Sequence, residues 1–517
     1  MNYIKNILLI NAPVYETYAS AKYQPLGIGY IAACLEQSGY NCDLYDANCG
    51  VVKKINEIIE YIMNNDYDVI GLSCMTDSFK SCVEIATKIK EINKNIIIIL
   101  GGHHATALHR EIINEYECFD YIIRGEGEKT FQKLIVSLNK GAGVNKIKGI
   151  SYRHTDKIFI NDDADYIQEL DVIPFPLRKK MENISKYTTY FDANSMKEKQ
   201  TATIITSRGC IGKCTYCVDQ DIYLKTIHKK WRCRSVENVT DELKTIFNLY
   251  PNVEHIIFFD ACFLADFERA ISILTELKRL KPGVTCSFTA RADQIVRNKD
   301  NIFLLKQLGC TSIEIGIESG SDDCLQRFCK NTSVEINEQA IKILRDNNLL
   351  VQVDFIMFEP YMTIKDLKLN MSFLKKNGLY GHYPPLIYNR IILYPGSKIR
   401  KQMEQENLTF GNYNNCQYEH LDKKVNNCWK KMLIYMKECS KLNTYIVGLE
   451  LKKFELIKKG SNINNNINSM VQLSKVLPYL YLEAVISEEE SSIDQNSKKY
   501  IDLANKVFEN MKEIYEI

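Results

Sequence analysis

The sequence predicts an α/β protein in three parts: an N-terminal doubly wound, Rossmann-like parallel sheet, a partial (βα)6 TIM-like barrel, and a mainly helical C-terminal region. Apolar strand-like runs alternate with helix-like stretches over residues 1–140, which is typical of a parallel sheet with helices on both faces. The alternation resumes with longer repeats over residues 201–400, after a connector at residues 141–200. Helical periodicity then dominates residues 401–517. Because 517 residues exceed one ordinary hydrophobic core, we expect separate domains.

The composition is that of a globular protein and excludes several classes of partner. Hydrophobic residues make up 45% of the chain, charged residues 25%, and the formal net charge is +2. This balance gives no reason to expect a nucleic-acid partner, and no apolar run is long enough for a stable membrane span. The 18 cysteines accompany an N-terminus without a signal-peptide layout. We therefore expect reduced thiols and a cytoplasmic location.

The N-terminal sheet is predicted from five apolar runs, at residues 7–11, 42–46, 67–73, 96–100 and 119–123. Ligands of such sheets bind at the carboxyl ends of the strands, where the connecting loops meet. These loops are polar and rich in glycine. They supply the candidate binding residues of this domain: Ser73, Gly101, Gly102, His103, Gly125 and Glu126.

Two parts of the chain have no predicted chemistry. The connector reads as a β-hairpin over residues 149–161 followed by an extended Ile173-Pro174-Phe175-Pro176 segment. The C-terminal region is expected to cap the barrel and help select the substrate. Its predicted helices span residues 423–441, 445–459, 471–486 and 497–514.

The clearest motif of the chain is a group of three cysteines, Cys210, Cys214 and Cys217, in the spacing C-x3-C-x2-C. A short apolar strand over residues 203–209 leads into it, and Gly209 gives the loop a permissive backbone. Four thiolates would saturate a zinc ion or an iron–sulfur cube, whereas three leave one position open. The motif therefore predicts a [4Fe–4S] cluster with one open iron, and a structural zinc knuckle is the alternative.

The barrel is predicted from the strand after the connector and five further strand-like runs. These cover residues 254–260, 285–291, 312–317, 351–357 and 387–393, and helical patterns separate them. Since barrel sites lie at the carboxyl-terminal mouth, polar residues at the strand ends are candidate ligand groups. They are Asp260, Arg291 and Glu318 with its neighbour Ser319. Cys262, Cys324 and Cys329 are irregularly spaced, and we predict no second cluster there.

Cysteines spaced C-x3-C-x-aromatic-C after a first strand resemble the radical S-adenosylmethionine (SAM) enzymes. In that family the open iron chelates SAM, and reductive cleavage releases a 5′-deoxyadenosyl radical. The resemblance implies that Cys210, Cys214 and Cys217 bind the cluster. It also implies a SAM site formed by Tyr216, Asp260, Arg291, Glu318 and Ser319. A planar guanidinium such as Arg291 suits the SAM carboxylate.

The first domain resembles the cobalamin (B12)-binding domain that precedes the barrel in one branch of this superfamily. The matching segments are Pro25–Tyr30, the Gly101-Gly102-His103 loop and the Gly125-Glu126-Gly127-Glu128 turn. This resemblance implies that Ser73, Gly101, Gly102, His103, Gly125 and Glu126 bind cobalamin. The Asp-x-His-x-x-Gly element that ligates cobalt in many cobalamin proteins is absent, so a histidine ligand to cobalt is not expected.

The resemblance implies a cobalamin-dependent radical SAM enzyme that methylates an unactivated carbon of a small-molecule or peptide substrate. A flavodoxin or ferredoxin would supply the electron. One alternative is a radical SAM cyclase, rearrangement or carbon–carbon coupling enzyme that does not use cobalamin. A tRNA methylthiotransferase would need three further cluster cysteines in the first domain and a basic, RNA-binding tail. The first-domain cysteines do not obviously supply the cluster, and the sequence shows no basic tail. An alternative of another class is an iron–sulfur electron-transfer or structural protein.

Overall fold

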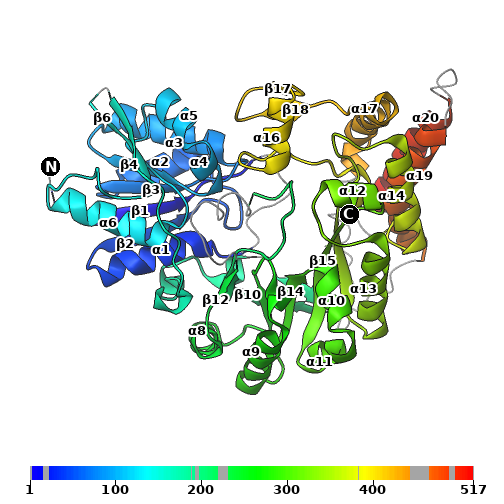
Figure 1. Cartoon of the computed structure of the whole chain (residues 1–517), viewed down its shortest axis with the longest axis horizontal. Helices are drawn as coiled ribbons and strands as arrows, with labels where there is room; N and C mark the ends of the chain where they lie inside the picture. The colour runs from blue at the N-terminus through cyan, green and yellow to red at the C-terminus, as the bar shows by residue number, and fades with distance from the viewer. Residues whose placement is uncertain are drawn as a thin grey trace.

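The computed structural model describes residues 3–15, 23–155, 157–187, 189–192, 197–218, 231–381, 384–442, 465–487 and 495–515. Two mainly parallel sheets lie side by side, and a group of long helices stands at the far end from the N-terminus (Figure 1). The first sheet is made by the N-terminal part of the chain and the second by its middle. The predicted α/β fold class is confirmed, with an N-terminal and a central parallel sheet followed by helices.

The N-terminal sheet has the strand order β2-β1-β3-β4-β5-β6-β7, and its first five strands are parallel. Alternate residues of the strands face opposite sides, so Ile7 and Leu9 pack on one face while Leu8 and Ile10 pack on the other. Helices α1 and α6 cover the first face, and α2, α3 and α5 cover the second, as a doubly wound sheet requires. The elements are β1 (Asn6–Asn11), α1 (Leu26–Gln37), β2 (Asn41–Asp46), α2 (Ile55–Met63), β3 (Val69–Ser73), α3 (Phe79–Ile92), β4 (Ile97–Gly101), α4 (His103–Ala107), α5 (His109–Glu115), β5 (Tyr121–Ile123) and α6 (Gly127–Asn139).

The hairpin expected in the connector belongs to this first sheet. Strands β6 (Ile150–His154) and β7 (Lys157–Ile160) pair antiparallel, and β6 pairs antiparallel with β5. The sheet therefore continues past residue 140, where the sequence pattern placed its end. Strand pairing between segments distant in the chain, which no local pattern reveals, accounts for the difference.

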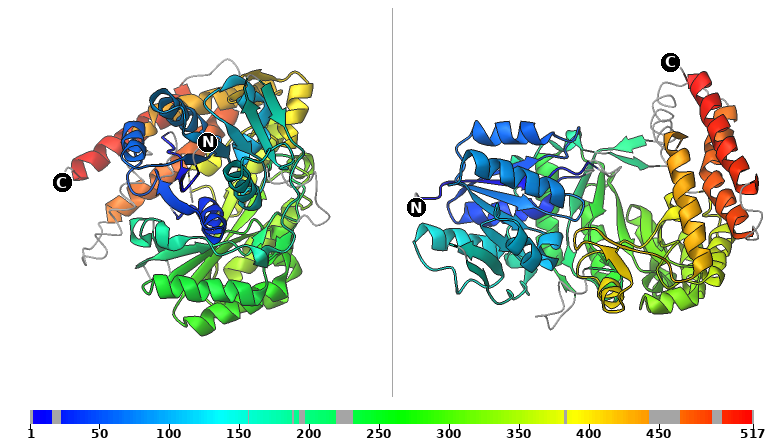
Figure 2. Two further views of the ribbon diagram at one scale, coloured as in Figure 1. Left: turned by 90° about the vertical axis from the view of Figure 1, so that its left-hand side faces the viewer. Right: turned by 90° about the horizontal axis from the view of Figure 1, so that it is seen from above.

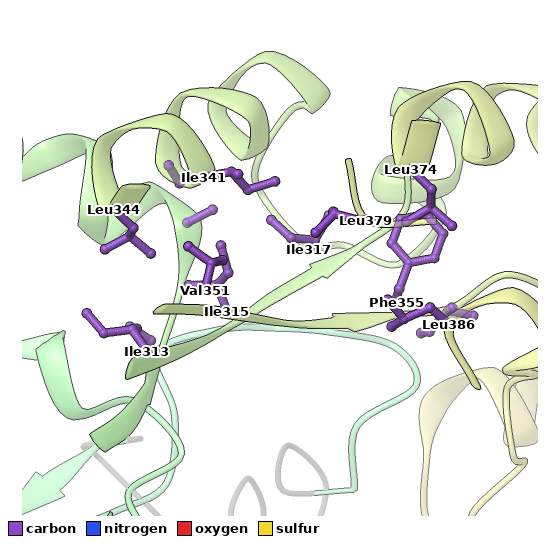
Figure 3. Packing of buried hydrophobic residues seen from close by; sticks show 14 of the residues in the cluster. Ile313, Ile315, Ile317, Ile341, Leu344, Val351, Phe355, Leu374, Leu379 and Leu386 are labelled. Atoms are coloured by element: carbon purple, nitrogen blue, oxygen red, sulfur yellow. The ribbon is translucent and has the colours of Figure 1, made fainter. Parts of the chain in front are cut away.

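The central sheet has the order β10-β13-β14-β15-β16, and all its strands are parallel. Ile313 and Ile315 of β15 and Val351 of β16 lie beneath Ile341 and Leu344 of α13 (Figure 3). The elements are β10 (Thr201–Ile204), β11 (Ser207–Arg208), β12 (Arg232–Cys233), α8 (Val236–Leu249), β13 (His255–Phe258), α9 (Phe267–Leu280), β14 (Thr285–Ala290), α10 (Ala292–Arg297), α11 (Ile302–Gln307), β15 (Cys310–Glu318), α12 (Asp322–Arg327), α13 (Val334–Asp346), β16 (Leu350–Phe355) and α14 (Ile364–Lys376).

The expected sixth barrel strand over residues 387–393 is wrong in detail. Helix α15 (Pro385–Tyr388) occupies its beginning, and a single parallel bridge between Phe358 and Arg390 replaces a ladder. Pro384 and Pro385 explain the helical start, because proline favours the first turn of a helix and cannot donate to a strand ladder. At the opposite end of the sheet, the ribbon β8 (Tyr190–Asp192) and β9 (Lys197–Lys199) places Tyr190 in a stack on His255.

The C-terminal region is mainly helical, as predicted, and its long helices lie together at one end of the molecule (Figure 2). The expected helix over residues 445–459 lies outside the described residues. A short hairpin that the sequence pattern did not indicate precedes the helices. The elements are α16 (Lys398–Gln405), β17 (Thr409–Gly411), β18 (Cys416–Tyr418), α17 (Lys423–Glu438), α19 (Asn465–Ser487) and α20 (Gln495–Tyr515). Within the part of the chain that the structure describes, we find no helix with the length and apolar character to cross a membrane.

Candidate active site

The cysteine loop follows β10 and β11 at the carboxyl end of the central sheet. Gly209, with φ of +80°, makes the turn from β11 into the loop. The Gly212 amide donates a hydrogen bond of 3.3 Å to the Cys210 Sγ. A methyl group at Gly212 would lie 3.5 Å from the Cys210 Sγ and 3.6 Å from the Cys214 Sγ. The two sulfurs thus lie on the same side of the loop, around a residue without a side chain.

The surroundings of Cys210 favour its thiolate. Its pKa is lowered to about 6, chiefly by a hydrogen bond from the Cys262 thiol, and further by the Gly212 amide and the charges of Arg291 and Lys330. The Gln294 Oε1, 3.4 Å from the Cys262 Sγ, is a second possible acceptor for the same thiol proton. A lowered pKa suits a cysteine that binds metal, since the thiolate is the ligand form.

Arg291 lies directly against the cysteine loop. It follows β14, and its Nη1 would be 3.0 Å from a methyl group at Gly212. The Nε donates to the Asp293 Oδ1 at 2.8 Å, and the Nη2 donates to the Lys330 carbonyl at 2.6 Å. These two bonds hold the guanidinium plane in place beside the loop.

Glu318 forms a buried ion pair with Lys330 at the end of β15. The Lys330 Nζ donates to the Glu318 Oε1 at 2.8 Å and to the Tyr216 hydroxyl at 3.3 Å. Burial, followed by the Glu318 charge, raises the pKa of Tyr216 well above its usual range. A methyl group at Gly316 would lie 2.5 Å from the Glu318 Oε1 and 2.6 Å from the Lys330 Nζ, so the pair occupies the space that this glycine leaves. Lys330 was missed by the sequence analysis, because it lies in a loop with no strand-end pattern.

Glu318 also has an unusual backbone conformation. Its φ is +65°, and the pairing of β15 with β16 shifts register between Gly316 and Glu318. Such a conformation is costly for a residue with a side chain, and it occurs where a side chain must be re-aimed. The irregularity turns the Glu318 carboxylate toward Lys330 and Tyr216.

The side chains of Asp260 and Ser319 form hydrogen bonds within the protein. The Asp260 carboxylate accepts from the backbone amides of Thr206 and Ser207 at 2.7 and 2.5 Å. The Ser319 hydroxyl donates to the Asn370 Oδ1 at 2.7 Å. Both side chains are almost completely buried. They therefore shape the strand ends and offer no free polar group to SAM in this structure.

The residues expected to bind cobalamin line the carboxyl end of the first sheet. Ser73 and Gly101 are partners in the register of β3 and β4. Gly102 has φ of +106°, and a side chain there would lie 2.4 Å from the Cys74 carbonyl oxygen. The Nδ1 of His103 is a buried nitrogen without a hydrogen-bond partner among the described residues. Gly125, with φ of +73°, lies beside the ring of Tyr166.

Glu126 is occupied by ion pairs. Its carboxylate accepts from the Arg232 Nη2 at 2.8 Å and Nη1 at 3.1 Å, and it lies 3.2 Å from Arg208. Burial alone would raise the pKa of Glu126, but these arginines lower it overall. The sequence analysis placed this residue against cobalamin, whereas the structure directs it toward the central domain. Both arginines are too distant in sequence for a local pattern to reveal the contact.

The donor set fits the two cofactor types that the sequence implies. Among the described residues, no three His, Cys, Asp or Glu side chains converge closely enough to hold one metal ion together. An iron–sulfur cube makes a different demand, because each of its cysteines binds a separate iron. The Cys210 and Cys214 sulfurs, 3.5 and 3.6 Å from the position of a methyl group at Gly212, are near enough to each other to bind neighbouring irons of one cluster. At the first sheet, the buried His103 Nδ1, which has no hydrogen-bond partner among the described residues, suits a polar ligand.

Comparison with known proteins supports the two-cofactor architecture. The B12 binding domain model matches residues 15–135, and the radical SAM superfamily model matches residues 204–374. The first match implies cobalamin, and the second implies a [4Fe–4S] cluster and SAM. The chain is 28% identical over 354 residues to an uncharacterized methyltransferase of Pyrococcus horikoshii, covering 68% of this chain and 73% of that protein.

One further relative and one solved structure agree with the two-cofactor architecture. The chain is 28% identical over 360 residues to the anaerobic magnesium-protoporphyrin IX monomethyl ester cyclase of a Synechocystis species, covering 66% of this chain and 67% of that protein. It superimposes on the cobalamin-dependent SAM radical enzyme OxsB with a TM-score of 0.77 and 20% identity. That superposition covers 99% of this chain and 79% of OxsB, and at this identity it shows a shared fold. The chain is thus a member of the radical SAM superfamily, in the branch that carries an N-terminal B12-binding domain.

Proposed function

We propose that this enzyme transfers a methyl group to an unactivated carbon, with Cys210, Cys214 and Cys217 holding the cluster and the first domain holding cobalamin. The observation that carries this proposal is the contact between the two candidate sites. Arg208, next to the cysteine loop, is bonded to Glu126 and Glu128 at the start of α6, just after β5. The ligand-binding ends of both sheets therefore meet at one interface, as a reaction using both cofactors requires.

The two cofactors would supply the reactive chemistry: a deoxyadenosyl radical from SAM at the cluster, and a methyl group from cobalamin. The protein's residues bind and orient. Arg291, held by Asp293 and the Lys330 carbonyl, presents a cation at the edge of the cysteine loop that suits the SAM carboxylate. Tyr216 lies in the same loop, and its hydroxyl accepts from Lys330, the ion-pair partner of Glu318. Ser73, Gly101, Gly102, His103 and Gly125 would border the corrin.

The remaining partners follow from the same chemistry. The family needs an external reductant, for which we propose a flavodoxin or ferredoxin, and it acts on small substrates, here a small molecule or peptide. We also propose a cytosolic location, because the cytosol keeps thiols such as those of the three cluster cysteines reduced.

A second candidate is a radical cyclisation or rearrangement at the same cluster. The similarity to a monomethyl ester cyclase favours it. The two candidates differ in whether a methyl group of SAM reaches the product.

The test is anaerobic reconstitution of the full chain with iron, sulfide and hydroxocobalamin, followed by desalting. We expect about one corrin per chain in the absorption spectrum, and formation of 5′-deoxyadenosine from SAM with dithionite. A Gly101→Val variant should lose corrin, because its side chain would occupy the space that we propose for the cofactor. It should keep the cluster, because Gly101 lies in the first domain and a Cβ there would come no closer than 3.9 Å to the Ile123 carbonyl oxygen. Gly283→Val, at a surface position with open space around it, is the matched control. A brown protein that cleaves SAM but retains no corrin would contradict the methyltransferase proposal.

A further inference from the structure

A buried group of charged residues joins the first domain to the loop that carries Cys210. Arg208 lies two residues before Cys210, in β11. Its Nη2 donates to the Glu128 Oε1 at 2.5 Å, and its Nη1 lies 3.2 Å from the Glu126 Oε1. Its guanidinium also lies over the Tyr30 ring of α1, at 5.4 Å from the ring centroid. Every one of these contacts is made with the first domain.

The second strand of the same ribbon makes a parallel contact. Arg232 of β12 is the register partner of Arg208 and donates through both terminal nitrogens to the two oxygens of Glu126. Glu126 thus bridges both strands of the β11–β12 ribbon. With Glu128, the group contains two carboxylates and two guanidinium ions. All four side chains are between 1% and 14% exposed.

Burial and the bidentate geometry make this group rigid. Opposite charges at these distances interact much more strongly in a low-dielectric interior than at a surface, and an arginine fork fixes orientation as well as distance. The carboxylates themselves are held firmly, because Glu126 and Glu128 lie at the start of α6, which packs on the first sheet through Phe131 and Leu134. These ion pairs therefore fix the position of the β11–β12 ribbon relative to the first sheet.

The connection between the β11–β12 ribbon and the cysteine loop is short. Only Gly209 separates Arg208 from Cys210, and the Ser207 amide is anchored to Asp260 in the central domain at 2.5 Å. Two adjacent residues thus restrain the approach to the loop: Asp260 of the central domain holds Ser207, and the two glutamates of the first domain hold Arg208.

We propose that Arg208 is a positioning residue, which sets the place of the cluster-bearing loop relative to the first domain through Glu126 and Glu128. The inference rests on the proposed function, because it takes Cys210 as a cluster ligand and the first domain as the cobalamin carrier. Arg208 touches no reacting atom; it acts by fixing the separation and orientation of the two cofactor sites.

The test compares the reconstituted, full-length wild type with Arg208→Lys and Glu128→Gln. A lysine keeps the charge but lacks the fork that reaches both carboxylates, and a glutamine keeps the shape but removes the charge. The matched control is Lys180→Gln, which removes a different ion pair to the first domain, with Glu36 and Asp43, outside this group. We measure amide hydrogen exchange over residues 205–217, and the cluster–cob(II)alamin distance distribution by pulsed electron paramagnetic resonance in the reduced, corrin-loaded protein.

We expect both variants to exchange the loop amides roughly tenfold faster, and to broaden the single narrow distance distribution of the wild type, while Lys180→Gln changes neither. Unaltered exchange and an unaltered distance distribution in the two variants would overturn the proposal. So would acceleration spread evenly over the chain or shared by Lys180→Gln. If Arg208→Lys does not fold, the near-isosteric Glu128→Gln decides.

The exchange comparison does not depend on corrin. If the wild type binds no cobalamin, the proposed function fails while the effect of Arg208 on the loop is still measured. If the wild type holds both cofactors and the variants match it, the positioning role alone fails.

Discussion

Lys330 and Glu318 form an ion pair of 2.8 Å at the end of β15, with both side chains less than one-tenth exposed. Lys330 connects the pair to the cysteine loop by a hydrogen bond to the Tyr216 hydroxyl. The pair occupies space that a side chain at position 316 would fill, so it requires a glycine there. Burial alone would lower the pKa of Lys330, yet Glu318 raises it overall, so the lysine is charged. Two compensating charges thus lie beside the candidate cluster site.

Replacing Lys330 by methionine should destabilise the protein strongly. The change keeps the apolar stem but leaves the Glu318 carboxylate buried without a partner of opposite charge, which costs about 3–5 kcal/mol. Urea unfolding followed by circular dichroism measures the difference. The control is Lys342→Met, which breaks the exposed pair with Asp346 and should change the free energy of unfolding by less than about 0.5 kcal/mol. Equal effects of the two changes would contradict a buried, compensating pair.

Alanine at Cys210, Cys214 or Cys217 should remove the cluster and lower SAM cleavage by about a hundredfold or more, since even outer-shell changes at metal sites cost 10–100-fold. Iron content and 5′-deoxyadenosine formation are the measurements. Cys329→Ser, at an exposed cysteine, should keep both at the wild-type level. Retention of a full cluster in any of the three alanine variants would remove that cysteine from the ligand set.

A methyl group at Gly212 should weaken SAM binding without destroying the cluster. In Gly212→Ala the new carbon lies 3.0 Å from the Arg291 Nη1, which is closer than ordinary contact, and the flexible end of the arginine must shift. We expect a Kd for SAM about tenfold higher, measured by titration of the reduced cluster signal. Gly283→Ala serves as the control. An unchanged Kd in Gly212→Ala would show that the position of Arg291 does not matter for SAM.

Acidification should destabilise the protein through His104. Burial lowers its pKa to about 4, and its ring bonds to Thr76 and to Asn414 of the β17–β18 hairpin. The unfolded histidine, with a pKa near 6.5, binds its proton first as the pH falls, so stability is complete above about pH 6.5 and declines toward pH 4. At pH 5 the loss from this residue is about 2 kcal/mol.

The measurement is urea unfolding of the protein without cofactors at pH 7.5 and pH 5. His104→Gln, which retains amide groups for hydrogen bonding but does not titrate, should lose about 2 kcal/mol less than the wild type between these two values. A variant with the same pH dependence as the wild type would assign the acid sensitivity to other groups.

Much of the architecture is readable from the sequence because it depends on local pattern. Both-sided apolar runs such as residues 7–11 specify buried parallel strands wherever their partners lie, and the five predicted strands of the first sheet all form. The cysteine spacing is equally local. The predicted sixth barrel strand does not form, because Pro384 and Pro385, just before its apolar run, begin helix α15.

The sequence by itself determined the fold class, the order of the domains and the loop that carries Cys210, Cys214 and Cys217. Only the tertiary structure decided which polar residues are free. It paired Glu318 with Lys330, assigned Asp260 to the turn before the cysteine loop, and directed Glu126 away from the expected cobalamin site to Arg208 and Arg232. The physical reason is that a buried charge needs a partner within a few ångströms, and that partner is chosen by the packing of the domains and not by distance along the chain.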